Sequence, residues 1–196
     1  MMKFFIATKN NGKIRELSRI FCELGIDVVS ERDLKEPMPE VEEDGETFED
    51  NALIKARAGA KFTELPTVAD DSGLCVDALG GAPGILSARY SGEHGNDKAN
   101  NEKLLKELSG VTASERTAHY ICAIACVFPD GREFTVSGRC DGSIDFKESG
   151  AGGFGYDPLF IGEVGKFSEV SAETKDAVSH RGKAVKLFKE RINDYL

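Results

Sequence analysis

Two adjacent acids, Asp70 and Asp71, are the residues whose types and spacing most directly suggest chemistry. Carboxylates can act as general bases and as ligands of divalent metal ions. The acids follow the apolar run 67–69 and precede Ser72 and Gly73. An apolar run that ends in acids predicts a buried strand with charge at its carboxyl end, where open α/β sheets bind ligands. On the local sequence alone, however, Asp-Asp-Ser-Gly favours an ordinary turn.

A polar, glycine-containing stretch at residues 8–13 is a candidate binding site for an anion. It follows an expected strand at 4–7 and precedes a helix whose apolar residues recur at helical spacing from Ile14 onward. Backbone N–H groups at a helix N-terminus favour anions, and Lys9 and Lys13 add positive charge. The stretch is not a Walker A loop, because the glycine–lysine–serine/threonine ending is missing. An ordinary loop with solvated lysines is the alternative interpretation.

A strongly acidic segment occupies residues 40–50. Such a run is typical of a solvated face or of the start of a helix. Thr47 and Asp50 predict a capping box at the N-terminus of an amphipathic helix that runs to about Phe62. This helix would carry Lys55, a second lysine that could neutralise an anion.

Two stretches near the C-terminus could contact a ligand. Residues 149–158 contain four glycines and two aromatics, which would let the backbone approach a ligand closely; a flexible loop is the alternative. Ser179 is a candidate cap for a last helix that begins with His180 and Arg181. Cations at a helix N-terminus oppose the helix dipole, which suggests an anionic or acceptor-rich partner; a plain surface pair is the alternative.

The remaining patterns indicate the elements that must position these residues. We expect a helix at 97–108, a long strand at 116–128, a hairpin turn at 129–132, a returning strand at 133–139 and a short strand at 159–161. The hairpin is predicted to form a lobe separate from the N-terminal strand and helix.

Composition limits the class of protein. The chain has 196 residues, of which 40% are hydrophobic and 30% charged, so we expect a folded protein of one domain, 1–196, with two lobes. The net charge of −9 argues against general binding to nucleic acid, which needs a basic surface. It permits a small anionic ligand, because a few lysines can line a local pocket.

The five cysteines are odd in number and form no Cys-x-x-Cys motif. They predict core thiols in a reducing compartment rather than disulfides. The apolar N-terminal residues are too few for a signal peptide, and no run approaches transmembrane length. We therefore expect a cytoplasmic protein without a membrane partner.

Seven motifs occur in the order that is typical of one known family; they lie at residues 7–13, 48–56, 69–74, 80–84, 87–90, 153–158 and 179–182. Through them the chain resembles the inosine/xanthosine triphosphate pyrophosphatases, which remove deaminated purine nucleotides. Each motif alone is weak, but seven in order without a large insertion are specific. The resemblance extends from residue 3 to about residue 190.

The resemblance implies an α/β fold with two lobes around a long mixed β-sheet and a central substrate cleft. It also implies a homodimer. The implied reaction is Mg²⁺-dependent cleavage of ITP, dITP or XTP between the α and β phosphates, which yields a nucleoside monophosphate and pyrophosphate.

The resemblance also implies roles for individual residues. Asp71 is the implied base, with Glu42 and Asp71 as the metal ligands and Glu43 as the alternative to Glu42. The implied substrate-binding residues are Thr8, Lys9, Asn10, Asn11, Gly12, Lys13, Lys55, Ser72, Phe154, Gly155, Tyr156, Asp157, Lys175, His180 and Arg181. The first loop and Lys55 would hold the triphosphate, and the residues from Phe154 onward would form the nucleoside pocket. Lys9 stands where many relatives carry a smaller residue, and it would either add phosphate affinity or be solvated.

Two other functions are compatible with parts of the sequence. A pyrimidine nucleotide pyrophosphatase of related fold would share the first loop and the acids but should lack the Ser-His-Arg motif at 179–181. A non-catalytic nucleotide-binding module would use the glycine-rich loop without hydrolysis. The adjacent Asp70 and Asp71 argue against such a module, because acids repel phosphate unless a metal ion intervenes.

Overall fold

The computed structural model describes residues 3–23 and 25–196. The strands are β1 (Lys3–Ile6), β2 (Asp27–Ser30), β3 (Thr67–Val76), β4 (Thr117–Val127), β5 (Glu133–Ile144), β6 (Phe160–Gly162) and β7 (Gly165–Lys166). They form one sheet in the order β2-β1-β3-β4-β5-β6-β7. β1 is parallel to β2 and β3, whereas β6 is antiparallel to β5 and β7. The predicted α/β class with a mixed sheet is confirmed.

Helices α1 (Asn11–Glu23), α2 (Phe48–Thr63), α3 (Asp97–Glu107), α4 (Ala172–Val178) and α5 (His180–Ile192) complete the fold. The chain divides into two compact units. The first unit consists of Met1–Asp71, Ala123–Ser137 and Ala184–Leu196, and the second of Ser72–Cys122 and Gly138–Lys183. No described helix is both long enough and apolar enough to cross a membrane.

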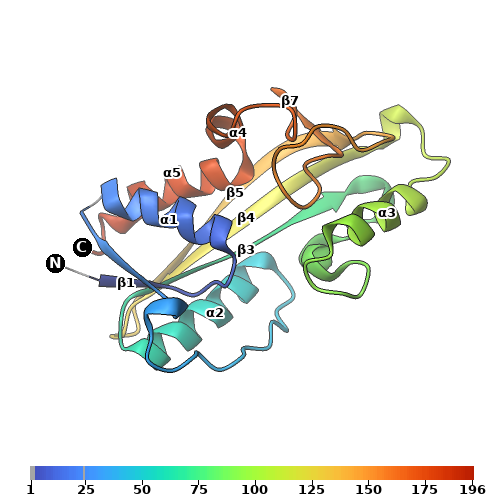
Figure 1. The fold of residues 1–196 in the computed structure, drawn as a ribbon. Coiled ribbons are helices and arrows are strands. Elements are labelled where there is room, and N and C mark those ends of the chain that lie inside the picture. The colour runs from blue at the N-terminus through green and yellow to red at the C-terminus, as the bar shows by residue number, and fades with distance from the viewer. Residues whose placement is uncertain (1–2, 24) are drawn as a thin grey trace. The chain divides into compact units, whose positions relative to one another are not determined.

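Alternating phenylalanines of β1 build the layers of the first unit. The ring of Phe4 lies 5.2 Å from that of Phe21 in α1, and Phe21 lies 5.5 Å from Phe188 in α5. Phe5 points to the opposite face, where a Cβ on Gly59 of α2 would approach its ring to 3.1 Å. Helices α1 and α5 therefore cover one face of this part of the sheet and α2 covers the other (Figure 1).

The predicted buried strand is present as β3, but it runs straight through the two acids, so Asp70 and Asp71 form neither a turn nor the end of their strand. The physical reason is that β3 continues beyond its parallel neighbour. β1 pairs with β3 only as far as Ile6 and Val68, followed by one hydrogen bond from the Ala7 N–H to the Val68 carbonyl, 2.9 Å. The acids thus lie beside the carboxyl end of β1 rather than at that of β3.

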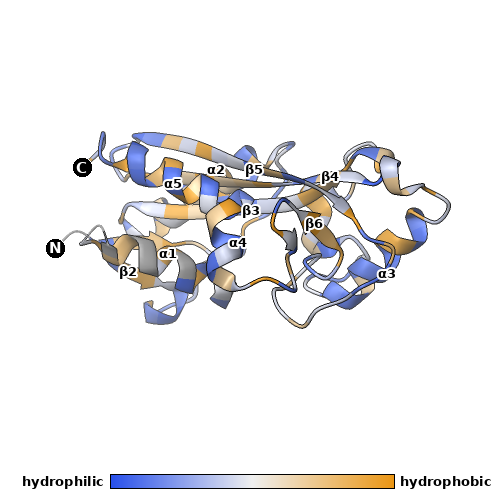
Figure 2. Ribbon diagram, turned by 90° about the horizontal axis from the view of Figure 1, so that it is seen from above, coloured by the Kyte–Doolittle hydropathy of each residue, from blue (hydrophilic) through white to orange (hydrophobic). Residues whose placement is uncertain are grey.

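The second unit has a core of its own. Tyr120 of β4 packs against Phe160 with ring centroids 4.7 Å apart, and Phe160 packs against Phe167 at 4.9 Å. Helix α3 contributes the buried Leu104 to this core although most of its surface is hydrophilic, as Figure 2 shows. The helix predicted for this segment is confirmed.

The predicted hairpin is present, with hydrogen bonds from the Phe128 N–H to the Arg132 carbonyl and from the Gly131 N–H to the Phe128 carbonyl. It does not form a separate lobe, because the turn end of the hairpin, Ala123–Ser137, belongs to the same unit as β1. Its strands have 11 and 12 residues, about twice the usual strand length, and the returning strand extends beyond the predicted end to Ile144.

The predicted caps of α2 and α5 are present. The Thr47 hydroxyl accepts a hydrogen bond from the Asp50 N–H, and the Asp50 side chain accepts from the Thr47 N–H, which completes the predicted capping box of α2. The Ser179 hydroxyl accepts from the Gly182 N–H at the start of α5. All five cysteines are free thiols, but Cys22 is exposed, so the prediction of core thiols is wrong for that residue.

Candidate active site

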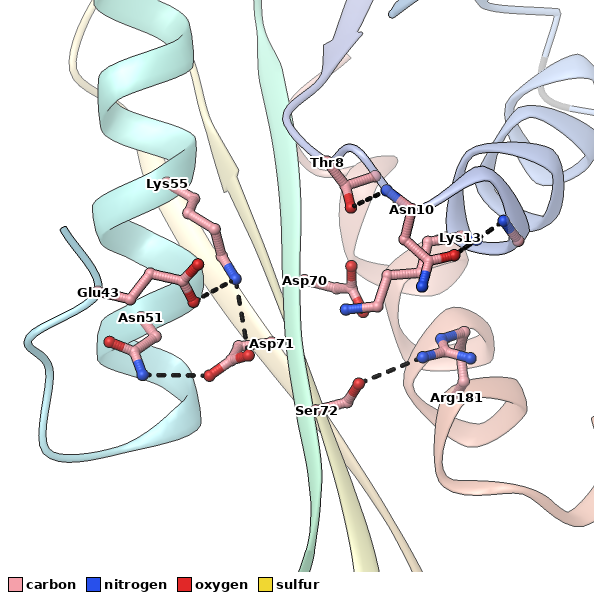
Figure 3. Close-up of polar contacts among 11 residues, drawn as sticks. Thr8, Asn10, Lys13, Glu43, Asn51, Lys55, Asp70, Asp71, Ser72 and Arg181 are labelled. Carbon is pink, nitrogen blue, oxygen red and sulfur yellow. Dashed lines mark hydrogen bonds and ion pairs between the residues drawn. The ribbon is translucent and has the colours of Figure 1, made fainter. Parts of the chain in front are cut away.

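The first loop is folded by its own side chains around the start of α1. The Thr8 hydroxyl accepts a hydrogen bond from the Asn10 N–H, 3.2 Å (Figure 3). The Asn10 carboxamide oxygen accepts from the N–H groups of Gly12, 2.8 Å, and Lys13, 3.2 Å. Asn10 is therefore the N-cap of α1. Two of the backbone N–H groups expected to bind an anion already donate to this oxygen. The attraction of this loop for an anion therefore depends mainly on the charge of its lysines.

Two neighbours in that loop lie at the surface. Lys9 is exposed, and Asn11 is exposed with its side-chain oxygen accepting a hydrogen bond from Arg32, 2.5 Å. Lys13, by contrast, reaches inward: its Nζ lies 2.8 Å from Oδ2 of Asp70, whose side chain is 2% exposed. Of the two lysines predicted for this loop, the structure brings only Lys13 to the acids.

Asp70 and Asp71 do not act as a pair, because consecutive side chains of a strand point to opposite sides. Asp70 points toward α1 and Lys13, whereas Asp71 points toward α2 (Figure 3). Asp71 is only half-buried and lies among groups from α2 and from the segment before it. The environments separate the roles: Asp70 is a buried ion-pair partner, and Asp71 is the acid available for chemistry.

Lys55 holds two carboxylates together on the α2 side of β3. Its Nζ donates to Glu43 Oε2, 2.7 Å, and lies 3.6 Å from Asp71 Oδ1. Helix α2 places Lys55 two turns from its N-terminus, and the acidic segment before α2 supplies Glu43. The ammonium shows that these two acids can share one cation.

The ionisation of this group is set by burial and by charge together. Burial raises the pKa of Asp71, Glu43 adds to the increase, and the ammonium groups of Lys55 and Lys13 work against it. Burial disfavours the charged form of Lys55, but Asp71, Asp70 and Glu43 outweigh this effect and raise its pKa. Asp71 is thus a carboxylate with raised proton affinity beside a firmly charged lysine, which suits a general base.

Asn51 is a residue of this group that the candidate list above did not include. It is 1% exposed, its Nδ2 donates to Asp71 Oδ2, 3.2 Å, and its Oδ1 accepts from the Gly45 N–H, 2.9 Å. A Cβ on Gly45 would lie 2.7 Å from this Oδ1, so only glycine fits there. A polar residue next to the buried Ala52 on the inner face of α2 was the available signal, because buried amides need partners.

The structure favours Glu43 over Glu42 as the companion of Asp71. Glu42 is exposed, whereas Glu43 is half-buried and bonded to Lys55. In the described part of the chain, no three histidine, cysteine, aspartate or glutamate side chains are grouped as a metal site. Two carboxylates that share a cation nevertheless fit Mg²⁺, which commonly takes one or two protein carboxylates and completes its shell with water and phosphate oxygens.

A second group of predicted residues comes together within the second unit. Arg181, 5% exposed, donates from Nη2 to the Ser72 hydroxyl, 3.2 Å (Figure 3). Phe154 is 48% exposed, and its ring centroid lies 5.6 Å from the Arg181 guanidinium carbon and 5.0 Å from Lys175 Nζ. An exposed aromatic ring beside two cations can stack on a flat, electron-rich ligand.

The other predicted residues of this group hold the loop in place. The buried Asp157 accepts hydrogen bonds from the Phe154 N–H, 3.0 Å, and from Lys175, 2.5 Å. The Tyr156 hydroxyl donates to the Ser87 carbonyl, 2.8 Å, so the protein itself uses that group. A Cβ on Gly153 would lie 2.1 Å from Asp157 Oδ2, which explains one glycine of the loop. The glycine-rich segment is therefore an organised turn.

His180 starts α5 and is 5% exposed. Its ring stacks on Tyr120, with centroids 4.5 Å apart and planes 11° from parallel. Burial holds the pKa of the Tyr120 hydroxyl well above its usual range. The stacking fixes the His180 ring, and the helix start places Arg181 next to it.

The chain is similar to known proteins over nearly its whole length. The profile of the Ham1 family matches residues 4–191. A dITP/XTP pyrophosphatase of Geobacter sulfurreducens is 51% identical over 194 residues, which cover 98% of this chain and 97% of that protein. A dITP/XTP pyrophosphatase of Desulforamulus reducens is 50% identical over 194 residues, which cover 98% of this chain and 96% of that protein.

Solved structures agree. The Ham1 protein of Staphylococcus aureus superposes with a TM-score of 0.89 at 39% identity, covering 99% of this chain and 100% of that one. The nucleoside-triphosphatase / dITP/XTP pyrophosphatase of Mycobacterium abscessus superposes with a TM-score of 0.80 at 49% identity, covering 95% and 97%.

Proposed function

This chain belongs to the Ham1 family, and on that premise we propose that it is an enzyme that hydrolyses deaminated purine nucleoside triphosphates. The substrates are ITP, dITP and XTP, and the products are the nucleoside monophosphate and pyrophosphate. The observation that carries the proposal is the cluster of Glu43, Lys55 and Asp71, an acid of raised proton affinity beside a lysine. Relatives named dITP/XTP pyrophosphatase support the choice of substrate.

Asp71 acts as the base in this proposal. Its ionised carboxylate accepts a proton from the water that attacks the α phosphorus, and the bond to the β-phosphate oxygen breaks as pyrophosphate leaves. Asn51 holds one Asp71 oxygen, which leaves the other oriented by Lys55. A positioned base of this kind typically contributes about 10²–10⁴-fold to the rate.

Lysines balance the charge of the substrate. Lys55 and Lys13 pair with carboxylates, and phosphate oxygens would compete for the same ammonium groups. Lys9 is exposed, so we assign it no contact with the substrate.

Glu43 and Asp71 are the residues that would hold Mg²⁺. The ion would offset the negative charge that develops on the leaving pyrophosphate. Glu42, the ligand that the family resemblance implies, is exposed, so we favour Glu43.

The second group selects the base. Arg181 can only donate hydrogen bonds, whereas inosine and xanthosine carry an acceptor oxygen at C6 and adenosine carries a donor amino group. A donor that faces a donor leaves buried groups unpaired, and such sites can discriminate by about 10⁴–10⁵-fold. Phe154 would stack on either purine without distinguishing them.

A turnover panel tests the proposal. ITP, dITP, XTP, GTP, ATP, dUTP and dTTP are offered with Mg²⁺, and pyrophosphate is measured separately from phosphate. We expect pyrophosphate from ITP, dITP and XTP far faster than from ATP. Faster release from dUTP or dTTP would indicate a pyrimidine enzyme, and tight binding of ITP without turnover would indicate a binding module.

The Asp71→Asn variant tests the assigned base in the same assay. We expect a loss of roughly 10²–10⁴-fold in kcat with nucleotide binding largely kept, since the amide cannot accept the proton. Near-normal turnover would reject Asp71 as the base. We also propose that the enzyme works as a homodimer in the cytoplasm, where free nucleotides are found; sedimentation of the purified protein would test the dimer.

A further inference from the structure

Two side chains of helix α3 bind the backbone of Gly155, next to Phe154, one through its N–H and one through its carbonyl. Oδ2 of Asp97 accepts a hydrogen bond from the Gly155 N–H, 2.7 Å. Nδ2 of Asn101 donates to the Gly155 carbonyl, 3.1 Å. Asp97 and Asn101 are four residues apart on α3 and so lie on one face of it. Their target is more than fifty residues away along the chain, and neither side chain was a candidate from the sequence.

The burial of Asn101 shows that this contact is specific. Asn101 is 3% exposed, and within the described chain its Oδ1 has no hydrogen-bond partner. A buried amide that satisfies only one of its ends is costly, and an apolar residue would pack at this position without that cost. The bond to Gly155 is what the asparagine supplies.

The grip of α3 complements a second hold from inside the loop. Asp157 accepts hydrogen bonds from the Phe154 N–H and from Lys175, so it holds the residue before Gly155 and ties the loop to α4. Gly155 itself has φ 61°, a left-handed conformation that orients the neighbouring peptide groups. The backbone that carries the exposed Phe154 ring is thus bonded both from α3 and from within the loop.

We propose that Asp97 and Asn101 are positioning residues for recognition of the base: they fix the loop so that Phe154 presents its ring in one orientation beside Arg181. The inference rests on the proposed function, because it assigns the loop to the nucleoside. It gives a role to α3, a helix that carries none of the residues assigned to the phosphates or to proton transfer.

Hydrogen exchange tests the hold directly. In Asp97→Ala and Asn101→Leu, we expect amide exchange of the peptide that covers residues 149–159 to speed up by at least tenfold, while exchange in α1 and α2 stays the same. Asp97→Asn keeps an acceptor oxygen but loses the same charge as Asp97→Ala, so it should restore slow exchange. Glu102→Ala on the exposed side of α3 is the matched control.

Kinetics test the effect of this hold on selection of the purine. We expect kcat/KM for ITP to fall roughly ten- to hundredfold in Asp97→Ala and Asn101→Leu, and its ratio to kcat/KM for ATP to shrink. Inhibition by pyrophosphate, which has no base, should be unchanged, and a general loss of structure would weaken it. Asp97→Asn should again recover most of the activity.

Three outcomes would overturn the proposal. Unchanged exchange in both variants would show that α3 does not hold the loop. Faster exchange with an unchanged ratio of ITP to ATP would show that the loop does not select the base. Equal loss in Asp97→Asn and Asp97→Ala would show that only the charge matters. If wild-type protein releases no pyrophosphate from ITP, the proposed function fails, and the exchange result still decides whether α3 holds the loop.

Discussion

Lys55 lowers the pKa of Asp71, and Asp71 raises the pKa of Lys55, so removing one group should shift the titration of the other. Burial raises the pKa of Asp71, and the Lys55 ammonium opposes the increase. The acid must be ionised to accept a proton from water. Its activity therefore rises with pH through its pKa and is lost below it.

Replacing Lys55 by methionine should move the acidic limb of the pH–rate profile of kcat/KM to higher pH. The substitution removes a cation that favours the ionised acid, so Asp71 stays protonated to a higher pH. Turnover of ITP would be followed across the acidic range. The control is Arg57→Met, which removes a cation from the same helix that pairs with Glu133 rather than with Asp71. A limb that stays in place or moves to lower pH would contradict the assignment.

Lys13→Met should destabilise the protein by about 3–5 kcal/mol, because it removes the ammonium from a carboxylate that is 2% exposed. Urea denaturation at neutral pH measures the free energy of unfolding. Adding Asp70→Asn should recover most of the loss, since a neutral amide tolerates burial better. Lys9→Met, in the same loop but exposed, should change stability by less than about 0.5 kcal/mol. Equal effects of the two lysine variants would refute the buried ion pair.

At the scale of elements, local patterns predicted the helices and their caps but not the path of β3. Thr47 and Ser179 predict helix starts because their hydroxyls cap backbone N–H groups only three residues away, without a distant partner. A strand that contains two aspartates runs against local propensity. It forms here because Lys13 and Lys55 arrive from two other elements, and sequence spacing does not reveal such partners.

The segment that carries Glu43 depends on α2 through a single amide. Asn51→Ala would leave the Gly45 N–H and one Asp71 oxygen without their partner, so we expect a loss of about 1–3 kcal/mol in stability and a roughly tenfold or greater fall in kcat. Asn51→Asp keeps an acceptor for Gly45 but places a buried carboxylate beside Asp71, so it should lower both kcat and stability further than Asn51→Ala does. Unfolding curves and turnover of ITP separate the two effects. Equal kcat in the two variants would argue against the contact with Asp71.

At the scale of the whole molecule, the seven motifs identified the family and hence the fold class. They did not place β2, the length of β5 or the residues of α3 that hold Gly155, because these follow from packing rather than from any local signal. Composition was informative about charge: a chain at −9 must recruit cations to bind a polyphosphate.

Removing Mg²⁺ should therefore abolish both turnover and tight binding of the nucleotide. With the slow Asn51→Ala variant, which keeps both assigned metal ligands, we expect ITP at a hundred times its Kd to stabilise the protein by about 2.7 kcal/mol. Chelation with EDTA should reduce this stabilisation and lower wild-type pyrophosphate release to background. An equal thermal shift with and without EDTA would contradict a metal requirement.

The first unit is assembled from three stretches that are far apart along the chain. Phe4 lies 5.9 Å from Phe128, and Phe21 lies 5.5 Å from Phe188. On the ribosome, β1 and α1 emerge before their apolar partners, Phe128 about 120 residues and Phe188 about 170 residues later in the chain. Until residues 184–196 leave the exit tunnel, the faces of β1 and α1 that carry these rings stay uncovered, which is a state prone to aggregation. During synthesis, α1 therefore gains the packing of its Phe21 against Phe188 only when α5 has emerged.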